Sequence, residues 1–524
     1  MQIIENTALR VTMPADDADR VLLGVAKSEV INQSNDNKEL VVYWGYDEAA
    51  FLAKVLDTDT TLPSPMLRDY SWSGIYTPFE HQKTTASFLS LRRRAFCFNE
   101  AGTGKTSSVI WAADYLMKLG LVKRVLVICP LSIMYSAWQA DIFKTAMHRT
   151  AGVAYGSRSK RAKVIEGAYE FVIINFDGVG VVREEIEKAN FDLIVADEAN
   201  AYKTVSTKRW RVLARILQPS TRLWMLTGTP ASQSPMDAYG LARLVSPHRT
   251  TKTMTAWRDK VMAQVSKFRW LPKPNSKQDV HYALQPAIRY TKKECLDLPE
   301  VMYQTRDVPL TPQVGMYYRK LKNQMLIEAA GQQISAVNAA SNLSKLLQIS
   351  GGAVYTDERN IVEFDVSPRL QALKETLDET SNKVVVFVPY IHTIEVVAKY
   401  VAKEGYTCEV IKGDVSAKQR TDIIQRFQSN TDPKILVVQP QSASHGITFT
   451  AADTIVFWSP VMSVETYLQC IARIDRIGQK NSMTVVHLEG SEVEHKMYTM
   501  LQGKVDQHQK LVDLYKQEIG LGGK

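Results

Sequence analysis

The residues most able to do chemistry lie in the segment Asn99–Thr106, which follows an apolar run at residues 95–98 and precedes a stretch with helical potential. A strand, a glycine turn and a helix N-terminus in this order cradle phosphate, because backbone N–H groups point at the anion and the helix dipole favours negative charge. The residues expected to bind a nucleotide are Gly102, Thr103, Gly104, Lys105 and Thr106. Lys105 would reach the β- and γ-phosphates, and the Thr106 hydroxyl would hold Mg²⁺. Asn99 stands where the general pattern has its first glycine.

Two adjacent carboxylates, Asp197 and Glu198, end an apolar run that begins at Phe191. We expect Asp197 to hold the metal and Glu198 to orient or deprotonate the attacking water. An ordinary strand that ends in a polar turn would look similar. The order strand, loop, helix, strand, carboxylates favours the catalytic interpretation, so the two patterns together predict hydrolysis of ATP with Mg²⁺.

The elements that must position these residues are near-continuous apolar runs that alternate with helical patterns. Such runs are typical of parallel sheets covered by helices on both faces. They lie at residues 124–130, 171–175 and 222–227, and again at 383–388, 434–438 and 454–458. The sequence therefore predicts an α/β fold with two parallel-sheet lobes, a mostly helical, basic insertion between them, and a small N-terminal α/β accessory domain.

Composition changes along the chain suggest five segments. We expect an accessory domain at residues 1–70, an ATP-binding lobe at 71–245, the basic and helical insertion with its linker at 246–365, a second lobe at 366–500, and a C-terminal helix and tail at 501–524.

Bulk properties exclude several classes of protein. The chain has 524 residues, of which 45% are hydrophobic and 23% charged, as in ordinary globular proteins. Its first residues have no secretory pattern, no apolar run reaches membrane-spanning length, and its five cysteines are scattered. We expect a cytoplasmic protein without membrane contact, whose thiols are reduced.

A basic block lies between Arg243 and Lys293, where twelve basic residues are opposed only by Asp259 and Asp279. Aromatic residues are interleaved with it. A charge run is usually a solvated face, and that alternative stays open, but a basic block with aromatics in an ATPase favours contact with a phosphate backbone. The residues expected to bind DNA here are Arg258, Lys260, Lys267 and Arg269.

The second lobe has no phosphate loop, but it carries two arginines, Arg473 and Arg476, three residues apart on a helix expected to end near Gly478. Residues at this spacing share one face of a helix. A solvated surface helix is the simple interpretation. The alternative is that they reach the nucleotide of the first lobe and stabilise charge on the transferring phosphoryl group when the lobes close.

On these motifs the chain resembles the Swi/Snf-like group of superfamily 2 helicases and translocases, from about residue 74 to about residue 500. The segments that carry the resemblance are 76–82, 99–106, 127–132, 197–200, 226–230, 290–294 with 298–299, 413–427, 446–453 and 473–479. Two departures are Asn200, where the group has histidine, and Asp475, where histidine is frequent.

The resemblance implies RecA-like lobes and assigns further roles. Gln82 would recognise the adenine base, and the pair Arg473 and Arg476 would complete the ATP site. Pro130 and Thr227 in the first lobe, and Ser444 and Thr450 in the second, would contact DNA.

The function that we expect is ATP-dependent translocation on double-stranded or branched DNA. Such a motor can migrate branches, remodel forks, anneal strands or displace bound protein. We expect a monomer that meets replication, recombination or transcription proteins in a bacterial nucleoid or a phage-infected cell. Two alternatives stay open: an ATP-binding regulatory protein that does not translocate, and a motor that acts on RNA or RNA polymerase.

Overall fold

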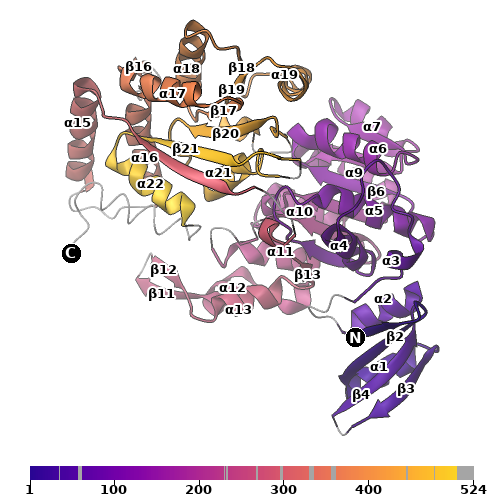
Figure 1. The fold of residues 1–524 in the computed structure, drawn as a ribbon. Coiled ribbons are helices and arrows are strands. Elements are labelled where there is room, and N and C mark those ends of the chain that lie inside the picture. The colour runs from indigo at the N-terminus through magenta and orange to yellow at the C-terminus, as the bar shows by residue number, and fades with distance from the viewer. Residues whose placement is uncertain are drawn as a thin grey trace. The chain divides into compact units, whose positions relative to one another are not determined.

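A computed structural model describes residues 1–34, 36–56, 62–228, 230–231, 234–266, 269–295, 299–329, 336–355, 361–443, 447–476 and 478–503. The chain divides into two compact units, Met1–Leu296 and Asp297–Lys524 (Figure 1). Within the described residues, no helix combines the length and the apolar character that crossing a membrane requires.

The first unit begins with a four-stranded antiparallel sheet in the order β1-β2-β4-β3. Its elements are β1 (Gln2–Ile4), β2 (Ala8–Pro14), α1 (Ala15–Gly24), β3 (Ser28–Gln33), β4 (Asn37–Tyr43) and α2 (Tyr46–Val55). Buried Leu9, Val11 and Met13 alternate along β2 with exposed residues, because successive side chains of a strand point to opposite faces. The buried residues pack with α1 and α2, so one face of this sheet is covered by helices.

The larger sheet of the first unit has seven strands, and all of its neighbouring pairs are parallel. In spatial order they are β13 (Ala287–Ile288), β5 (Arg94–Cys97), β10 (Arg222–Leu226), β9 (Leu193–Asp197), β6 (Val125–Cys129), β8 (Phe171–Asn175) and β7 (Ala151–Ala154). The apolar runs expected to form a parallel sheet do so.

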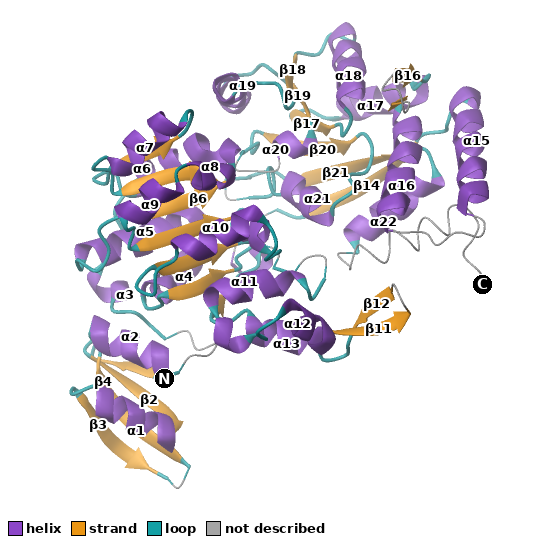
Figure 2. Ribbon diagram, turned by 180° about the vertical axis from the view of Figure 1, so that it is seen from behind, coloured by secondary structure: helices purple, strands orange, loops and turns teal. Residues whose placement is uncertain are grey.

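Helices cover both faces of this sheet (Figure 2). Val125 and Val127 belong to one core and Leu126 and Ile128 to the other, as the two-residue period of a strand requires. The first core includes α3 (Met66–Asp69), α4 (Glu80–Ser90), α5 (Lys105–Lys118), the 3₁₀ turn η1 (Leu131–Ile133), the π-helix η2 (Met134–Gln139) and α6 (Ala140–Thr145). The second includes α7 (Arg158–Glu166), α8 (Phe176–Val181), α9 (Arg183–Ala189), η3 (Ala199–Tyr202), α10 (Lys208–Ile216), α11 (Asp237–Val245), α12 (Met254–Val261) and α13 (Ser276–Ala283).

The second unit is built on a six-stranded parallel sheet. In spatial order its strands are β14 (Val301–Asp307), β21 (Met483–Glu489), β20 (Ala452–Phe457), β17 (Lys383–Phe387), β19 (Ile435–Val438) and β18 (Cys408–Ile411). The surrounding helices are α15 (Pro312–Ala329), α16 (Ala336–Gly351), α17 (Ser367–Glu379), α18 (Ile391–Lys403), α19 (Ala417–Ser429), α20 (Pro440–Ala443), α21 (Val464–Ile471) and α22 (Glu492–Gln502). The predicted pair of α/β lobes is therefore confirmed.

The segment 246–365, expected to be one mostly helical insertion, is divided between the two units. Its first part adds η4 (Pro247–Arg249), α12, α13, α14 (Lys292–Cys295) and the hairpin of β11 (Met262–Ser266) and β12 (Arg269–Pro272), and it supplies the edge strand β13. Its second part supplies the edge strand β14, α15, α16 and the hairpin of β15 (Ala353–Tyr355) and β16 (Ile361–Glu363). The segment thus completes both sheets.

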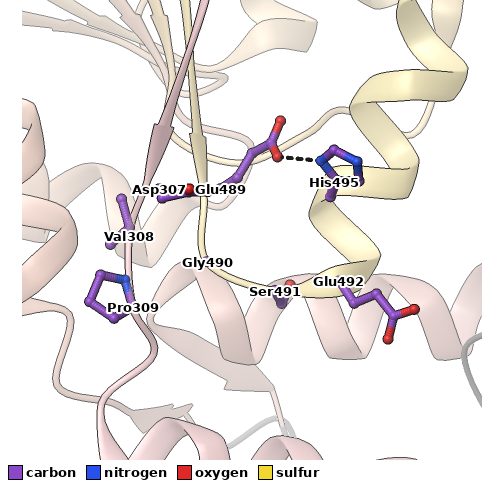
Figure 3. A pocket seen from close by; sticks show the side chains of 8 residues that line it. All are labelled: Asp307, Val308, Pro309, Glu489, Gly490, Ser491, Glu492 and His495. Carbon is purple, nitrogen blue, oxygen red and sulfur yellow. Dashed lines mark hydrogen bonds and ion pairs between the residues drawn. The ribbon is translucent and has the colours of Figure 1, made fainter.

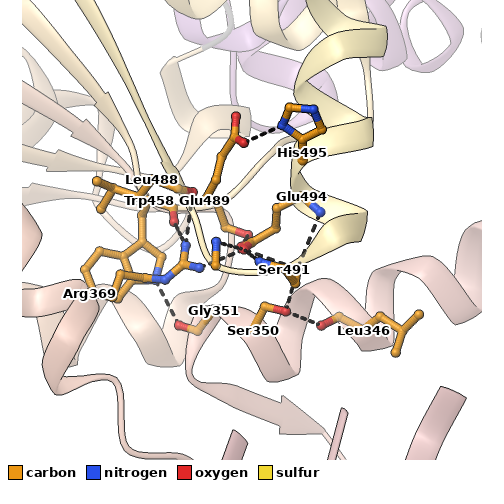
Figure 4. A network of polar contacts seen from close by, with 12 residues as sticks. Leu346, Ser350, Gly351, Arg369, Trp458, Leu488, Glu489, Ser491, Glu494 and His495 are labelled. Carbon is orange, nitrogen blue, oxygen red and sulfur yellow. Dashed lines mark hydrogen bonds and ion pairs between the residues drawn. The ribbon is translucent and has the colours of Figure 1, made fainter. Parts of the chain in front are cut away.

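A buried ion pair ties the helices of the second unit to its sheet (Figure 4). Arg369 of α17 and Glu494 of α22 are 2% and 0% exposed, and their Nη2 and Oε2 atoms lie 2.8 Å apart. Nη1 of Arg369 donates to the carbonyls of Trp458 and Leu488, and the Trp458 indole donates to Gly351. Strands β20 and β21 and helices α16, α17 and α22 are therefore joined by one polar network.

Arg369→Met is expected to lower the free energy of unfolding by about 3–5 kcal/mol, because it leaves the Glu494 carboxylate buried without its cationic partner. Urea-dependent hydrogen exchange of the β20 and β21 amides measures the loss. Lys374→Met on the same helix removes only the exposed ion pair with Asp378, so its effect should be much smaller. Equal losses in the two variants would contradict this role of the buried pair.

A pocket of about 440 Å³ lies where β14 and β21 end (Figure 3). Its lining residues are Asp307, Val308, Pro309, Glu489, Gly490, Ser491, Glu492 and His495. The His495 imidazole pairs with the Glu489 carboxylate at 2.9 Å. None of these residues belongs to the predicted nucleotide site.

Candidate functional site

Three neighbouring strands of the first unit bring the predicted nucleotide residues to one edge of the sheet. β5 leads into the glycine-rich loop, β9 ends at Asp197, and β10 lies between them. The amide of Thr227, just after β10, donates to the carbonyl of Cys97 at 3.1 Å. A Cβ on Gly228 would lie 3.4 Å from the Ala101 nitrogen, so the chain after β10 packs directly against the loop.

The loop needs its glycines. Gly102 and Gly104 have φ angles of 89° and 80°, which side chains disfavour. A Cβ on Gly104 would also lie 1.9 Å from the Gln82 amide nitrogen. Helix α5 begins at the next residue, Lys105, and Thr106 follows in its first turn. The unpaired N–H groups of that turn therefore face the loop, as a phosphate site requires.

Two side chains of α4 hold the loop from the other side. Nε2 of Gln82 donates to the carbonyl of Thr103 at 3.2 Å, and Nε2 of His81 lies 2.8 Å from the same oxygen. Oε1 of Gln82 accepts from the amide of Phe79 at 3.0 Å. Gln82 thus lies beside the loop, and its expected role in binding the base stays a prediction. His81 was not predicted, because a lone histidine carries no spacing signal.

Lys105 and Asn99 are fixed by the loop itself. The Lys105 ammonium donates to the carbonyls of Asn99 and Glu100, at 2.8 and 3.1 Å. Asn99 is 1% exposed, and its side chain donates to the Thr85 hydroxyl at 2.9 Å and accepts from the Tyr290 amide at 3.0 Å. An asparagine in place of the first glycine therefore ties the loop to α4 and to the segment after β13.

The acidic pair at the end of β9 has a defined geometry. Oδ1 of Asp197 accepts from the Glu198 amide at 3.0 Å, and Oδ2 accepts from the Trp138 indole at 2.9 Å. Glu198 has a left-handed backbone conformation, with φ 53° and ψ 55°. Such a conformation in a residue with a long side chain is strained and is concentrated at functional sites.

The residues at this edge fit a magnesium nucleotide. The Thr106 hydroxyl and the Asp197 carboxylate offer hard oxygen ligands of the kind that Mg²⁺ prefers. The glycine cradle, in which a Cβ would clash, and the ammonium of Lys105 suit a polyphosphate. Burial raises the pKa of the neighbouring Cys97 thiol to about 11 although the Lys105 charge opposes this shift, so the thiol stays neutral.

The two arginines of the second unit lie differently from the prediction. Helix α21 ends at Ile471, and Arg473 and Arg476 follow in turns, because the Arg473 carbonyl accepts from the Phe449 amide at 2.8 Å. Both guanidinium groups donate to the carbonyl of Ile447, at 3.2 and 3.3 Å. They share a partner, although they do not share a helix.

The expected DNA contacts are distributed over both units. Pro130 follows β6 and Thr227 follows β10; both are buried. Arg258 stacks on Trp270 with its guanidinium carbon 4.2 Å from the ring centroid, and Lys260 pairs with Asp279 at 2.9 Å.

The four other residues expected to contact DNA are Thr450 in the second unit and three whose side chains the structure does not describe. The Thr450 hydroxyl accepts from Gln428 at 3.4 Å. Lys267, Ser444 and the side chain of Arg269 lie outside the described residues, as do residues 504–524 of the predicted C-terminal helix and tail.

Comparison with known families identifies the class to which this fold and site belong. Residues 368–478 match the family described as "Helicase conserved C-terminal domain", so the second unit contains a helicase-type domain. Residues 81–352, just over half of the chain, match the family described as "SNF2-related domain". The chain belongs to the SNF2-related family of helicase-type ATPases, whose membership implies that ATP is bound and hydrolysed.

Individual relatives are distant. "Putative protein p41" of Acyrthosiphon pisum secondary endosymbiont phage 1 is 27% identical over 425 residues, which cover 76% of this chain and 88% of that protein. "Chromodomain-helicase-DNA-binding protein 1-like" of Mus musculus is 24% identical over 427 residues, or 78% of this chain and 46% of that protein. This chain therefore spans less than half of the mouse relative.

Among solved structures, the "Sulfolobus solfataricus SWI2/SNF2 ATPase core in complex with dsDNA" aligns with 86% of this chain and 96% of its own, at 21% identity and a TM-score of 0.42.

Proposed function

We propose that this chain is a DNA-dependent ATPase that moves along double-stranded DNA. The observation that carries the proposal is the arrangement of β5, β10 and β9, which brings the phosphate loop, Thr227 and the acidic pair to one edge of one sheet. A nucleotide held by the loop would lie beside the segment after β10. Hydrolysis of the nucleotide can then move that segment. Such a movement is required if hydrolysis is to be coupled to the binding of a second ligand.

The residues of the site divide the chemistry between them. Lys105 and the N–H groups of the first turn of α5 bind the phosphates, and Glu198 orients the attacking water and accepts its proton. Thr106 and Asp197 would hold Mg²⁺, which neutralises phosphate charge when bound. Gln82 would bind the adenine base from α4. Arg473 and Arg476 would stabilise the transferring phosphoryl group once the two units close on the nucleotide.

The proposed track is a DNA backbone. Pro130, Thr227, Arg258, Lys260, Lys267, Arg269, Ser444 and Thr450 are the residues proposed to contact it. Contacts with phosphates position a protein without reading sequence, so this motor would act on DNA of any sequence. The proposal includes branched DNA as a second substrate and proteins of replication, recombination or transcription as partners. The chain is proposed to act as a monomer.

ATPase turnover measured with duplex DNA, single-stranded DNA, RNA and no nucleic acid tests the proposal. Duplex DNA should stimulate turnover most, and the chain should displace a triplex-forming strand from a duplex in an ATP-dependent reaction. Glu198→Gln, which keeps the size of the side chain and removes its charge, should bind ATP without displacing the strand. Turnover indifferent to nucleic acid would favour a regulatory ATP-binding protein, and preferential stimulation by RNA would favour an RNA motor.

Neutralising Arg258 and Lys260 together should weaken binding to duplex DNA of any sequence. Each lost phosphate contact lowers the slope of log affinity against log salt by about 0.9, so the double alanine variant should lose a slope of about two. Fluorescence anisotropy at several salt concentrations measures both quantities. Arg158→Ala, which removes the ion pairs of α7 with Glu184 and Glu185, is the control. An unchanged slope would mean that the two side chains form ion pairs with Asp259 and Asp279 and do not contact DNA phosphates.

A further inference from the structure

We propose that Trp138 is a positioning residue for Asp197, and that it connects this carboxylate to the segment after β6. The second half of this inference rests on the proposed function, which places that segment on the DNA backbone through Pro130. Trp138 was not among the residues predicted from sequence. It would give the protein a direct route by which DNA contact changes the geometry at the nucleotide.

The hydrogen bond between the two residues is shielded from water. Nε1 of Trp138 lies 2.9 Å from Oδ2 of Asp197, the tryptophan is 0% exposed and the aspartate 9%. The other carboxylate oxygen accepts from the Glu198 amide at 3.0 Å. Each oxygen thus has a fixed donor, while an ionised carboxylate retains further lone pairs for a cation. The two donors together set the plane of the carboxylate.

The path of the chain explains how the indole reaches this position. β6 and β9 are neighbours, with Ile128 opposite Ala196, so Asp197 at the end of β9 lies beside Pro130, which follows β6. From Pro130 the chain turns through η1 directly into the π-helix η2, which carries Trp138. A π-helical turn holds an extra residue, which changes the direction of the side chains that follow it, and such turns are frequent at functional sites.

Packing alone does not account for this tryptophan. Trp111 and Trp224 belong to the same core and are equally buried, and their indoles donate to the main-chain carbonyls of Ser73 and Arg92. Those bonds link structural elements. The indole of Trp138 donates instead to the side chain that the site would use to hold Mg²⁺. Groups that orient a metal ligand in this way typically change metal affinity or activity by 10- to 100-fold when they are removed.

The proposed link to DNA rests on the continuous segment that joins Pro130 to Trp138. Seven residues lie between Pro130 and Trp138, and they belong to η1 and η2 without an intervening loop. A shift of the segment at Pro130 would therefore move the indole, and with it the Asp197 carboxylate. In this arrangement the DNA-free site is held in a less productive geometry, and backbone contact brings the carboxylate into place.

Trp138→Phe tests the inference, with Trp224→Phe as the matched control from the same core. In the first measurement, ADP raises the unfolding temperature, and the Mg²⁺ concentration that gives half of this rise is determined. This measurement needs no ATP turnover. The second is the ratio of ATPase rates with and without duplex DNA, and the third is DNA affinity without nucleotide. For Trp138→Phe we expect a 10- to 100-fold higher Mg²⁺ requirement, a stimulation ratio that falls at least 10-fold, and DNA affinity within 2-fold of the parent.

Each outcome decides a part of the inference. An unchanged Mg²⁺ requirement overturns the positioning role, and an unchanged stimulation ratio overturns the link to DNA. If the parent chain shows no stimulation by DNA, the proposed function fails while the Mg²⁺ measurement still decides the role of Trp138. If Trp138→Phe does not fold, benzothienylalanine at position 138 keeps the shape of indole and replaces only the N–H by sulfur. Effects of the same size in Trp224→Phe would show that general core damage is responsible.

Discussion

Lys105→Ala should lower ATP turnover by about 10³-fold, since a single preorganised donor to developing charge commonly contributes a factor of 10²–10³. The Lys105 ammonium is held at the loop by the carbonyls of Asn99 and Glu100, so its charge lies at the loop proposed to bind the phosphates. Its removal deletes the positive charge and leaves two loop carbonyls without their donor. ATPase rates with saturating duplex DNA and binding of a fluorescent ATP analogue measure the effect.

The matched control is Lys83→Ala. Lys83 lies on α4, one residue from Gln82, and pairs with Glu80 on the exposed side of the helix at 2.7 Å. The Lys83→Ala substitution should leave ATP turnover unchanged. A Lys105→Ala chain that hydrolyses ATP within 10-fold of the parent rate would refute the assignment of the phosphate loop, whatever its effect on DNA binding.

Arg476→Ala should lower DNA-stimulated turnover by roughly 10³–10⁵-fold if this residue acts as an arginine finger. Such a guanidinium stabilises the transition state more than bound ATP, because it meets the γ-phosphate only in the closed state. Lysine should not restore activity, since an ammonium lacks the planar fork. Arg473→Ala should lower turnover as well, but it should also lower the unfolding temperature, because Arg473 is 5% exposed and donates to Gln469 and Ile447.

Stimulated ATPase rates and thermal unfolding of the two variants separate these effects, and DNA affinity without nucleotide should change little in either. Near-normal stimulated turnover in both variants would mean that the second unit does not complete the active site. The proposed translocation along DNA would then be refuted too, since it depends on closure of the two units around the nucleotide.

The sheets could be predicted because their strands are buried on both faces. Residues 124–130, 171–175 and 222–227 are near-continuous apolar runs, and β6, β8 and β10 lie within them. The edge strands β13 and β14 could not be predicted from the sequence. β14 has exposed residues along most of its length, and β13 has two residues, so neither has a run that stands out from a loop. The sequence of the segment that contains them therefore favours an insertion between the two lobes.

The site could be predicted only where its residues are close in sequence. The phosphate loop and the pair Asp197 and Glu198 are contiguous motifs, so their spacing identifies them. The bond from Trp138 to Asp197 spans 59 residues and that from Tyr290 to Asn99 spans 191. Contacts of this range depend on the order of strands in the sheet, which one sequence does not specify. The arginines were placed on a helix because the bond between Phe449 and Arg473 could not be foreseen.

The left-handed backbone conformation of Glu198 lowers the stability of the fold at a position whose carboxylate is proposed to be needed for turnover. A residue with a side chain in this conformation costs roughly 1–2 kcal/mol relative to the right-handed region, a cost that glycine would avoid and asparagine would reduce. Either replacement would relax the chain and remove the carboxylate. The role proposed for Glu198 would therefore keep glutamate at this position at a cost in stability.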